Sequence, residues 1–280
     1  MLPVLLKAAL PSVPVVNQLP GVRKVPGADL GSLSASREVS VERDHVTAYG
    51  AVCGFPHKDT APLPYPHVLA FPLHLELMTS PEFPFPAIGS VHLENTITAH
   101  RAIEVGEALE VTVTVRGPRP HPRGALVDFV TEVRGSEHVA WESVSTYLRR
   151  GASASGEPGP GLTLPDPLPG GIEWRLPADL GRRYAAVSGD RNPIHLYPWT
   201  ARALGFPRQI AHGMSTLARC LAALENRLPD AVQVEVAFRK PVLLPGSVRF
   251  ATAGDRHERT FSLANPADGA AHLVGRARAL

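Results

Sequence analysis

Cysteine, long apolar runs and an excess of charge of either sign are scarce in this chain. The 280 residues hold two cysteines, Cys53 and Cys220, which lie far apart without metal-type spacing. This usage excludes a disulfide scaffold and favours a reducing cytoplasm. The net charge of +2 is too small to indicate a nucleic-acid surface. No run of about 18 apolar residues occurs, so we expect no membrane span.

Signatures of targeting, metal binding and phosphate binding are also missing. The apolar start, residues 1–16, is interrupted by Lys7 and Pro11 and lacks a cleavage site. We therefore expect an arm packed on the protein rather than a signal peptide. The histidines outside the motif described below are too scattered for a metal site. No glycine-rich stretch has a phosphate-loop pattern, so we expect neither a metal nor a cofactor.

A segment rich in glycine, proline, serine and alanine divides the chain. It covers residues 149–172, and such a composition cannot bury a core, which is typical of a linker. The sequence therefore predicts an N-terminal domain at residues 1–148 and a C-terminal domain at residues 173–280.

The two halves resemble each other. Three short stretches match in the same order, and although each match is weak alone, their shared order predicts a duplicated domain. The matched stretches are residues 49–54 with 184–189, 69–77 with 210–218, and 101–111 with 241–251.

Both halves have the same order of predicted elements. In the second half, Asp179 is expected to cap a short helix that stops at Gly189. A second short helix starts at Pro198, and a longer one runs from about Met214 to Arg227. Alternating strands follow, so we predict an α+β fold in which an antiparallel sheet wraps around a central helix. The expected strands are residues 92–100, 108–117, 125–135, 138–150, 232–239, 247–253, 259–264 and 271–279.

The stretch YAAVSGDRNPIH, residues 184–195, places a carboxylate and an imidazole in one short loop. Asp190 follows Gly189 directly, and His195 comes five positions later. Pro193 restricts the loop, so that His195 is able to turn back towards Asp190. A loop that only connects two elements does not require this pair, so the stretch indicates chemistry.

Together with ARALGFPRQIAHGM, residues 201–214, this stretch resembles the hydratase 2 motif of the MaoC-like family. The layout of nearly the whole chain is similar to the actinobacterial double-hotdog 3-hydroxyacyl-thioester dehydratases. The resemblance implies two hotdog domains, of which the C-terminal one is catalytic. It also implies reversible addition of water to trans-2-enoyl thioesters in fatty-acid metabolism, giving (R)-3-hydroxyacyl thioesters.

The resemblance also implies roles for individual residues. Asp190 and His195 are expected to act as base and acid–base partner, without a decision on which group moves which proton. The Gly213 amide, at the start of the long helix, is expected to stabilise the thioester oxygen. Asn192 is expected to touch the substrate or to pin the loop through backbone hydrogen bonds. His212 is expected to support this site.

The first half lacks these groups in the alignment described above. Phe55 follows Gly54 where Asp190 follows Gly189, and Thr60 stands at the position of His195. Phe71 and Pro72 align with His212 and Gly213. We therefore expect the first half to shape the acyl pocket instead. Its prolines Pro66, Pro72 and Pro81 are expected to interrupt its central helix and open a cavity for a long acyl chain.

The carrier, the oligomeric state and two other functions stay open. The substrate is expected as an acyl-CoA or an acyl-carrier-protein thioester, and the protein as a monomeric pseudo-dimer or a homodimer. A hotdog acyl-thioesterase and a non-catalytic acyl-thioester-binding subunit are the alternatives. The candidates for contact with the carrier's phosphates are Arg191, Arg208, Arg239 and Lys240.

Overall fold

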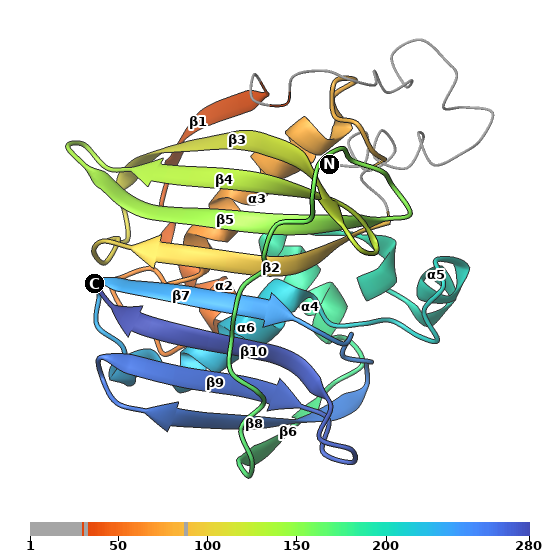
Figure 1. The fold of residues 1–280 in the computed structure, drawn as a ribbon. Coiled ribbons are helices and arrows are strands. Elements are labelled where there is room, and N and C mark those ends of the chain that lie inside the picture. Colours follow the sequence, from red (N-terminus) through yellow and green to blue (C-terminus); the bar gives the residue numbers. More distant parts are fainter. Residues whose placement is uncertain (1–29, 31–32, 87–88) are drawn as a thin grey trace.

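The computed structural model of the chain describes residues 30, 33–86 and 89–280 (Figure 1). The apolar start at residues 1–16, expected as a packed arm, lies outside these residues. Within the described part of the chain, no helix is both long and apolar enough to cross a membrane.

Ten strands form one continuous antiparallel sheet in the order β1-β3-β4-β5-β2-β7-β10-β9-β8-β6 (Figure 1). All eight strands predicted from alternation are present. The short strands β1 and β6 at the two sheet edges were not predicted. The bounds are β1 Ser34–Ser40, β2 Ser90–Ala99, β3 Ala108–His121, β4 Gly124–Arg134, β5 Val139–Arg150, β6 Ile172–Leu176, β7 Val232–Phe238, β8 Gly246–Gly254, β9 Glu258–Ala264 and β10 Ala271–Ala279.

The strand order has an internal symmetry. The first five strands of the sheet, β1-β3-β4-β5-β2, are mirrored by the last five, β7-β10-β9-β8-β6. The two halves join where β2 pairs with β7 from Glu94–Ala237 to Ala99–Val232. The repeated arrangement agrees with the predicted duplication of the domain. Because the two halves share one sheet, side chains from both halves are able to meet on the same face of that sheet.

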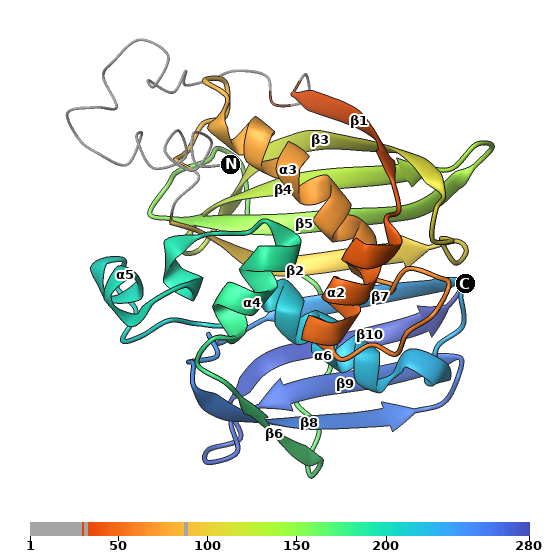
Figure 2. The same ribbon diagram turned by 180° about the vertical axis from the view of Figure 1, so that it is seen from behind.

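The helices lie on one face of the sheet, which Figure 2 shows from that side. Helix α3 contacts β1, β3 and β4 of the first half, and α6 contacts β9 of the second. Inward side chains of the strands alternate with outward ones, as in β3, where Leu109, Val111 and Val113 are buried. The bounds are α2 Arg43–Cys53, α3 Tyr65–Thr79, α4 Leu180–Ser188, α5 Pro198–Ala203 and α6 Gly213–Ala223, with 3-10 turns η4 at Pro193–His195 and η5 at Glu225–Arg227.

Helix α3 is continuous, so the predicted interruption by prolines was wrong. It has 15 residues, against 11 in α6. Pro66 lies in its first turn, where a backbone amide needs no intrahelical partner, and Pro81 lies beyond its end. Only Pro72 is inside the helix. Apolar residues buried around the helix, among them Val68 and Leu73, hold it against the sheet despite the lost hydrogen bond.

Helix α4 ends as predicted but starts without the predicted cap. Gly189 follows its last residue with φ 76°, a left-handed conformation that glycine adopts without strain. Gly54 ends α2 in the same way, with φ 89°. Asp179 precedes α4, but its side chain makes no capping hydrogen bond. Its backbone is already helical, with φ −93° and ψ 0°, rather than extended as at most capping residues.

Residues 151–171, between β5 and β6, contain no helix or strand. They cross the face of the sheet that is opposite to the helices (Figure 1). The Leu162 N–H donates to Glu94 Oε1 at 3.1 Å, and the Leu168 N–H donates to Ser262 Oγ at 3.0 Å. These bonds tie the segment to β2 in one half and to β9 in the other. The domain limits at residues 148 and 173 stay a prediction.

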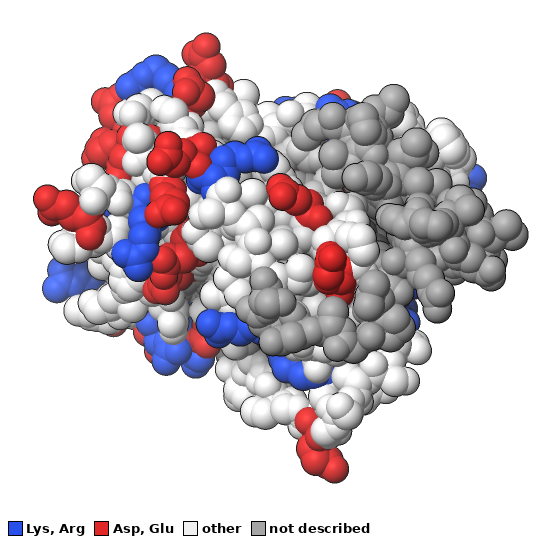
Figure 3. Space-filling view, turned by 90° about the horizontal axis from the view of Figure 1, so that it is seen from above, with Lys and Arg blue, Asp and Glu red and all other residues white. Residues whose placement is uncertain are grey.

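Charges of both signs are mixed on the face drawn in Figure 3. Acidic and basic side chains alternate there among the described residues, and no continuous basic stripe crosses that view. Such a surface is in keeping with the small net charge of +2.

Candidate active site

The loop after α4 is held by its own polar side chains. The Asn192 N–H donates to Asp190 Oδ1 at 3.1 Å, and the Asp190 N–H donates to Ser188 Oγ at 3.2 Å. Asn192 Oδ1 in turn accepts from the Ile194 N–H at 3.4 Å, which starts the turn η4. Asn192 therefore pins the loop, and it also lines the cavity described below. The backbone around Asp190 is set before any ligand binds.

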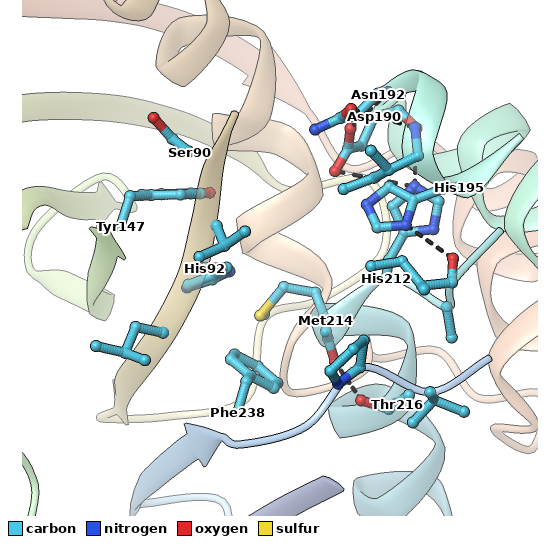
Figure 4. A pocket seen from close by; sticks show the side chains of 18 of the residues that line it. Ser90, His92, Tyr147, Asp190, Asn192, His195, His212, Met214, Thr216 and Phe238 are labelled. Atoms are coloured by element: carbon cyan, nitrogen blue, oxygen red, sulfur yellow. Dashed lines mark hydrogen bonds and ion pairs between the residues drawn. The ribbon is translucent and has the colours of Figure 1, made fainter. Parts of the chain in front are cut away.

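His195 and His212 meet beside Asp190, although 16 residues of chain lie between them (Figure 4). His195 Nδ1 donates to the Ile210 carbonyl at 2.8 Å, because a carbonyl oxygen only accepts. His212 Nε2 donates to the Asp190 carbonyl at 3.0 Å. The two rings stack with centroids 3.7 Å apart. These bonds fix the neutral tautomers, in which His195 Nε2 and His212 Nδ1 carry no proton.

Burial changes the pKa of all three groups. It lowers the pKa of His195 to about 3, with the nearby His212 acting in the same direction. It lowers the pKa of His212 to about 4. Burial raises the pKa of Asp190 above its usual value, against the opposing effects of His195 and the Asn192 amide. At neutral pH the site therefore holds two neutral imidazoles beside a carboxylate that is a stronger base than usual.

Gly213 is the first residue of α6 and lines the same cavity as Asn192. The first amides of a helix have no intrahelical acceptor and lie at the positive end of its dipole. A Cβ atom at this position would approach the Phe238 ring to 3.1 Å, which is tighter than ordinary contact. Glycine therefore keeps space open between the start of α6 and the end of β7.

One cavity collects these groups and is lined by both halves of the chain. The second half contributes Asp190, His195 and Gly213, and the first half contributes His67, His92 and Tyr147. Four exposed cationic residues also line it, two from each half: Arg123, Arg150, Arg239 and Lys240. Arg191 and Arg208, the other two predicted phosphate contacts, do not line this cavity.

The three titratable groups do not fit a metal ion. Asp190, His195 and His212 offer ligand atoms within 4.8 Å of one another, a grouping that the sequence did not predict. The free nitrogens His195 Nε2 and His212 Nδ1, however, lie on rings that stack at 28°. Because the lone pair of an imidazole nitrogen lies in its ring plane, the pairs of two stacked rings cannot converge on one tetrahedral centre.

The structure aligns the two halves in a different register from the one predicted by the sequence. The Ala61 N–H donates to the Ile103 carbonyl as the Ala211 N–H donates to the Val242 carbonyl, both at 2.8 Å. Counted from these bonds, Leu63 occupies the place of Gly213. The equivalence of Pro72 with Gly213, and the argument from its missing N–H, were therefore wrong.

The first half also has no room for a counterpart of His195. Only residues 55–60 lie between Gly54 and Ala61, whereas residues 190–210 lie between Gly189 and Ala211. The longer connection holds η4 and α5, which the first half lacks among its described residues. The first half also has no carboxylate at the position of Asp190, because Phe55 follows Gly54. The first half thus lacks both the carboxylate and the loop that carries the imidazole.

Gly181 supports His195, a role that the sequence did not predict. It is the second residue of α4, and a Cβ atom there would overlap the backbone carbonyl of His195. Only glycine allows the start of α4 to lie this close to η4. A glycine in a short helix gives no sign of such an approach, because η4 is distant from it in sequence.

We expect Gly181→Ala to lower kcat by up to about 100-fold, because a backbone clash moves His195 away from Asp190. The free energy of unfolding is expected to fall by about 1–3 kcal/mol. Steady-state kinetics and urea unfolding check both values. The matched control is Gly50→Ala in α2, where the new Cβ meets Phe55 O at an ordinary 3.6 Å. Equal activity of the two variants would contradict the role of Gly181.

The fold and this site define a MaoC-like dehydratase with two hotdog halves, and the chain belongs to that family. A model of the MaoC like domain matches residues 172–265. The 3-hydroxyacyl-thioester dehydratase X of Mycobacterium tuberculosis is 42% identical over 275 residues, covering 97% of this chain and 94% of that protein. The α+β double-hotdog prediction is confirmed.

Solved structures agree with this assignment. The crystal structure of HtdX of Mycobacterium tuberculosis superposes with a TM-score of 0.79 at 40% identity, covering 89% of this chain and all of that one. A MaoC-like dehydratase from Phytophthora capsici has a TM-score of 0.73 at 19% identity, over 90% and 96% of the two chains. This second likeness concerns the fold alone.

Proposed function

We propose that the protein is a hydro-lyase of fatty-acid metabolism. It adds water to trans-2-enoyl thioesters and, in reverse, dehydrates (R)-3-hydroxyacyl thioesters. The observation that carries the proposal is the buried pair of Asp190 and neutral His195 in the cavity that Gly213 also lines. The similarity to a 3-hydroxyacyl-thioester dehydratase over 97% of the chain supports the same reaction.

In this proposal Asp190 and His195 hold the reacting water between them. Both are proton acceptors at rest, since His195 keeps its proton on Nδ1, bonded to Ile210 O. As the water oxygen bonds to C3, one of the two groups takes a proton from it. That proton is then available for C2, so water is added without an external reagent. The dehydration direction retraces these steps.

Gly213 is proposed to stabilise the charge that develops during this step. When C3 is attacked, electron density moves to the thioester oxygen and forms an enolate-like state. The Gly213 amide, at the N-terminus of α6, is a suitable donor to that oxygen. Asn192 acts by pinning the loop, since its Oδ1 already accepts from the Ile194 N–H.

The thioester carrier is proposed to bind at the four exposed cations, Arg123, Arg150, Arg239 and Lys240. Their charge suits the phosphates of coenzyme A or of the carrier protein's prosthetic arm. Each half supplies two of them, so one chain provides the complete arrangement, as a monomeric pseudo-dimer or within a homodimer. The two buried, free cysteines suit a reducing cytoplasm.

The test supplies trans-2-enoyl-CoA esters of increasing chain length and follows the loss of the conjugated double bond. We expect hydration with an (R)-3-hydroxyacyl product, identified by chiral analysis. An (S) product contradicts the proposal, and release of free thiol without hydration indicates a thioesterase instead. Acyl-carrier-protein esters, tested in parallel, decide the carrier.

A further inference from the structure

A second cavity lies beside the segment that connects β5 to β6. Residues 164–167 of that segment line it, and so do Arg123, Arg239 and Lys240. We call the space between these four residues and the three cations the linker groove. Its volume of about 450 Å³ is that of a small-molecule site, so the groove is able to hold part of a substrate.

The linker groove adjoins the catalytic cavity. Arg123, Arg239 and Lys240 line both of them, as do Leu93 and Phe238. The cations come from both halves, because Arg123 lies in the turn between β3 and β4, whereas Arg239 and Lys240 directly follow β7. A ligand that lies in both cavities at once therefore passes the three cations.

The segment after β7 that carries two of these cations is fixed against β10. The Arg239 N–H donates to the His272 carbonyl at 2.9 Å, and the Lys240 N–H donates to the Ala271 carbonyl at 3.2 Å. His272 Nδ1 in turn donates to the Lys240 carbonyl at 3.1 Å. Within the described part of the chain, no carboxylate forms an ion pair with Arg123, Arg239 or Lys240. Their charge is therefore available to an anionic ligand.

Residues 164–167 are held in place on both sides. They belong to the segment that crosses the sheet face opposite to the helices (Figure 1). The Leu162 N–H is bonded to Glu94 before them and the Leu168 N–H to Ser262 after them. Two of the four residues are prolines, which restrict the backbone further. A groove bounded in this way admits a small or extended molecule, but not a folded carrier protein.

The lining of the groove combines positive charge with apolar surface. Asp166 is the one carboxylate among its described lining residues, so the three cations leave a net positive charge. Leu164, Pro165 and Val274 are among its apolar lining residues. Beyond its pantetheine arm, coenzyme A carries phosphates and a flat purine base, which suit such a combination. The arm of a carrier protein has one phosphate and no base.

We propose that the linker groove binds the adenosine end of coenzyme A, so that the segment between the two halves forms part of the substrate site. This inference rests on the proposed hydration and names its carrier. The three cations meet the phosphates, and residues 164–167 contact the nucleotide. Binding of a part of the substrate that does not react raises kcat/KM, so coenzyme A esters are preferred over carrier-protein esters.

The test compares one trans-2-enoyl group on pantetheine, on 4′-phosphopantetheine, on coenzyme A and on acyl carrier protein. The step from 4′-phosphopantetheine to coenzyme A adds only the adenosine end. We expect this step to raise kcat/KM by roughly 10-fold or more. The carrier-protein ester is expected to react no faster than the 4′-phosphopantetheine ester.

A carboxylate placed in the groove tests the role of the segment. Leu164→Glu is expected to raise KM for the coenzyme A ester by roughly 10-fold, because like charges then face each other. The pantetheine ester has no phosphate, so its turnover is expected to be unchanged, which also shows that the variant is folded. The matched control is Thr163→Glu, which adds the same charge at an exposed residue that does not line the groove.

Asp166→Lys is the second variant if Leu164→Glu does not fold. Asp166 is exposed, so the substitution is compatible with the fold. It replaces a negative charge in the groove by a positive one. We expect KM for the coenzyme A ester to fall by about 2-fold or more, while KM for the pantetheine ester stays the same.

Three results overturn the inference. One is an equal kcat/KM for the 4′-phosphopantetheine and coenzyme A esters. Another is a preference for the carrier-protein ester over the coenzyme A ester. The third is the same KM for the coenzyme A ester in Leu164→Glu and Thr163→Glu. In all three cases hydration itself is still observed. Absence of hydration of every ester would instead refute the proposed function together with this inference.

Discussion

Asp190→Asn is expected to lower kcat for hydration of a trans-2-enoyl thioester by roughly 10²–10⁴-fold, the usual contribution of a positioned general base. The amide has the size of the carboxylate but cannot accept a proton from water. Its oxygen is still able to accept from the Asn192 N–H, as Asp190 Oδ1 does at 3.1 Å. The loop is therefore expected to keep its conformation, with Tm nearly unchanged.

The matched control is Asp179→Asn at the other end of α4, where the carboxylate makes no capping hydrogen bond. It is expected to keep nearly full activity. Retention of most activity in Asp190→Asn would reject the assignment of the base. A large fall in Tm of Asp190→Asn would show a structural role instead.

The pH profile of the unmodified enzyme is part of the same prediction. Asp190 is active when ionised, so kcat/KM falls as the pH decreases through its pKa. Because burial raises that pKa above the usual value, the acidic limb is expected at a higher pH than for an exposed aspartate.

The free energy of unfolding is expected to fall steeply as the pH drops below about 6.5. The cause is a set of histidines whose pKa values burial lowers in the folded protein, five of them strongly. Below their unfolded pKa of about 6.5 the unfolded chain binds protons that the folded chain does not, so acid favours unfolding. The five are His67, His74, His92, His195 and His212.

The expected magnitude is large for a protein of this size. For His67 and His212, with folded pKa values of about 4, the gap from 6.5 corresponds to about 3 kcal/mol each. This stability is complete above the unfolded pKa and is lost as the pH falls towards the folded values. Summed over several such groups, the loss of unfolding free energy is comparable to the roughly 5–15 kcal/mol that stabilises a typical domain.

Urea unfolding at a series of pH values between about 8 and 4.5 measures this effect. We expect His67→Leu to flatten the dependence, because one proton-binding site of the unfolded chain is removed. His138→Leu, which replaces an exposed histidine in the β4–β5 hairpin, is measured alongside as the control for the substitution itself. A free energy of unfolding that stays constant down to about pH 5 would contradict burial of neutral histidines.

Local patterns predicted most of the elements, and the misses have physical causes. Strands such as β3 alternate between buried and exposed side chains, so their period is visible in the sequence. β1 reads SASREVS and is mostly exposed, with little apolar alternation to detect. Pro72 was read as a helix breaker, but burial around α3 outweighs one lost hydrogen bond. Propensity is a weak signal where packing is extensive.

The sequence by itself determined the family, the fold class and the loop residues Asp190, Asn192 and His195, because these lie close together in the chain. Only the tertiary structure decided which residues of the first half face them. The pairing of β2 with β7 brings His92 into the cavity of Asp190. The tertiary structure also decided the role of Gly181, since contact between α4 and η4 depends on how the chain folds back. Local spacing carries no information on contacts between residues distant in sequence, because the packing of the whole sheet and its helices determines them.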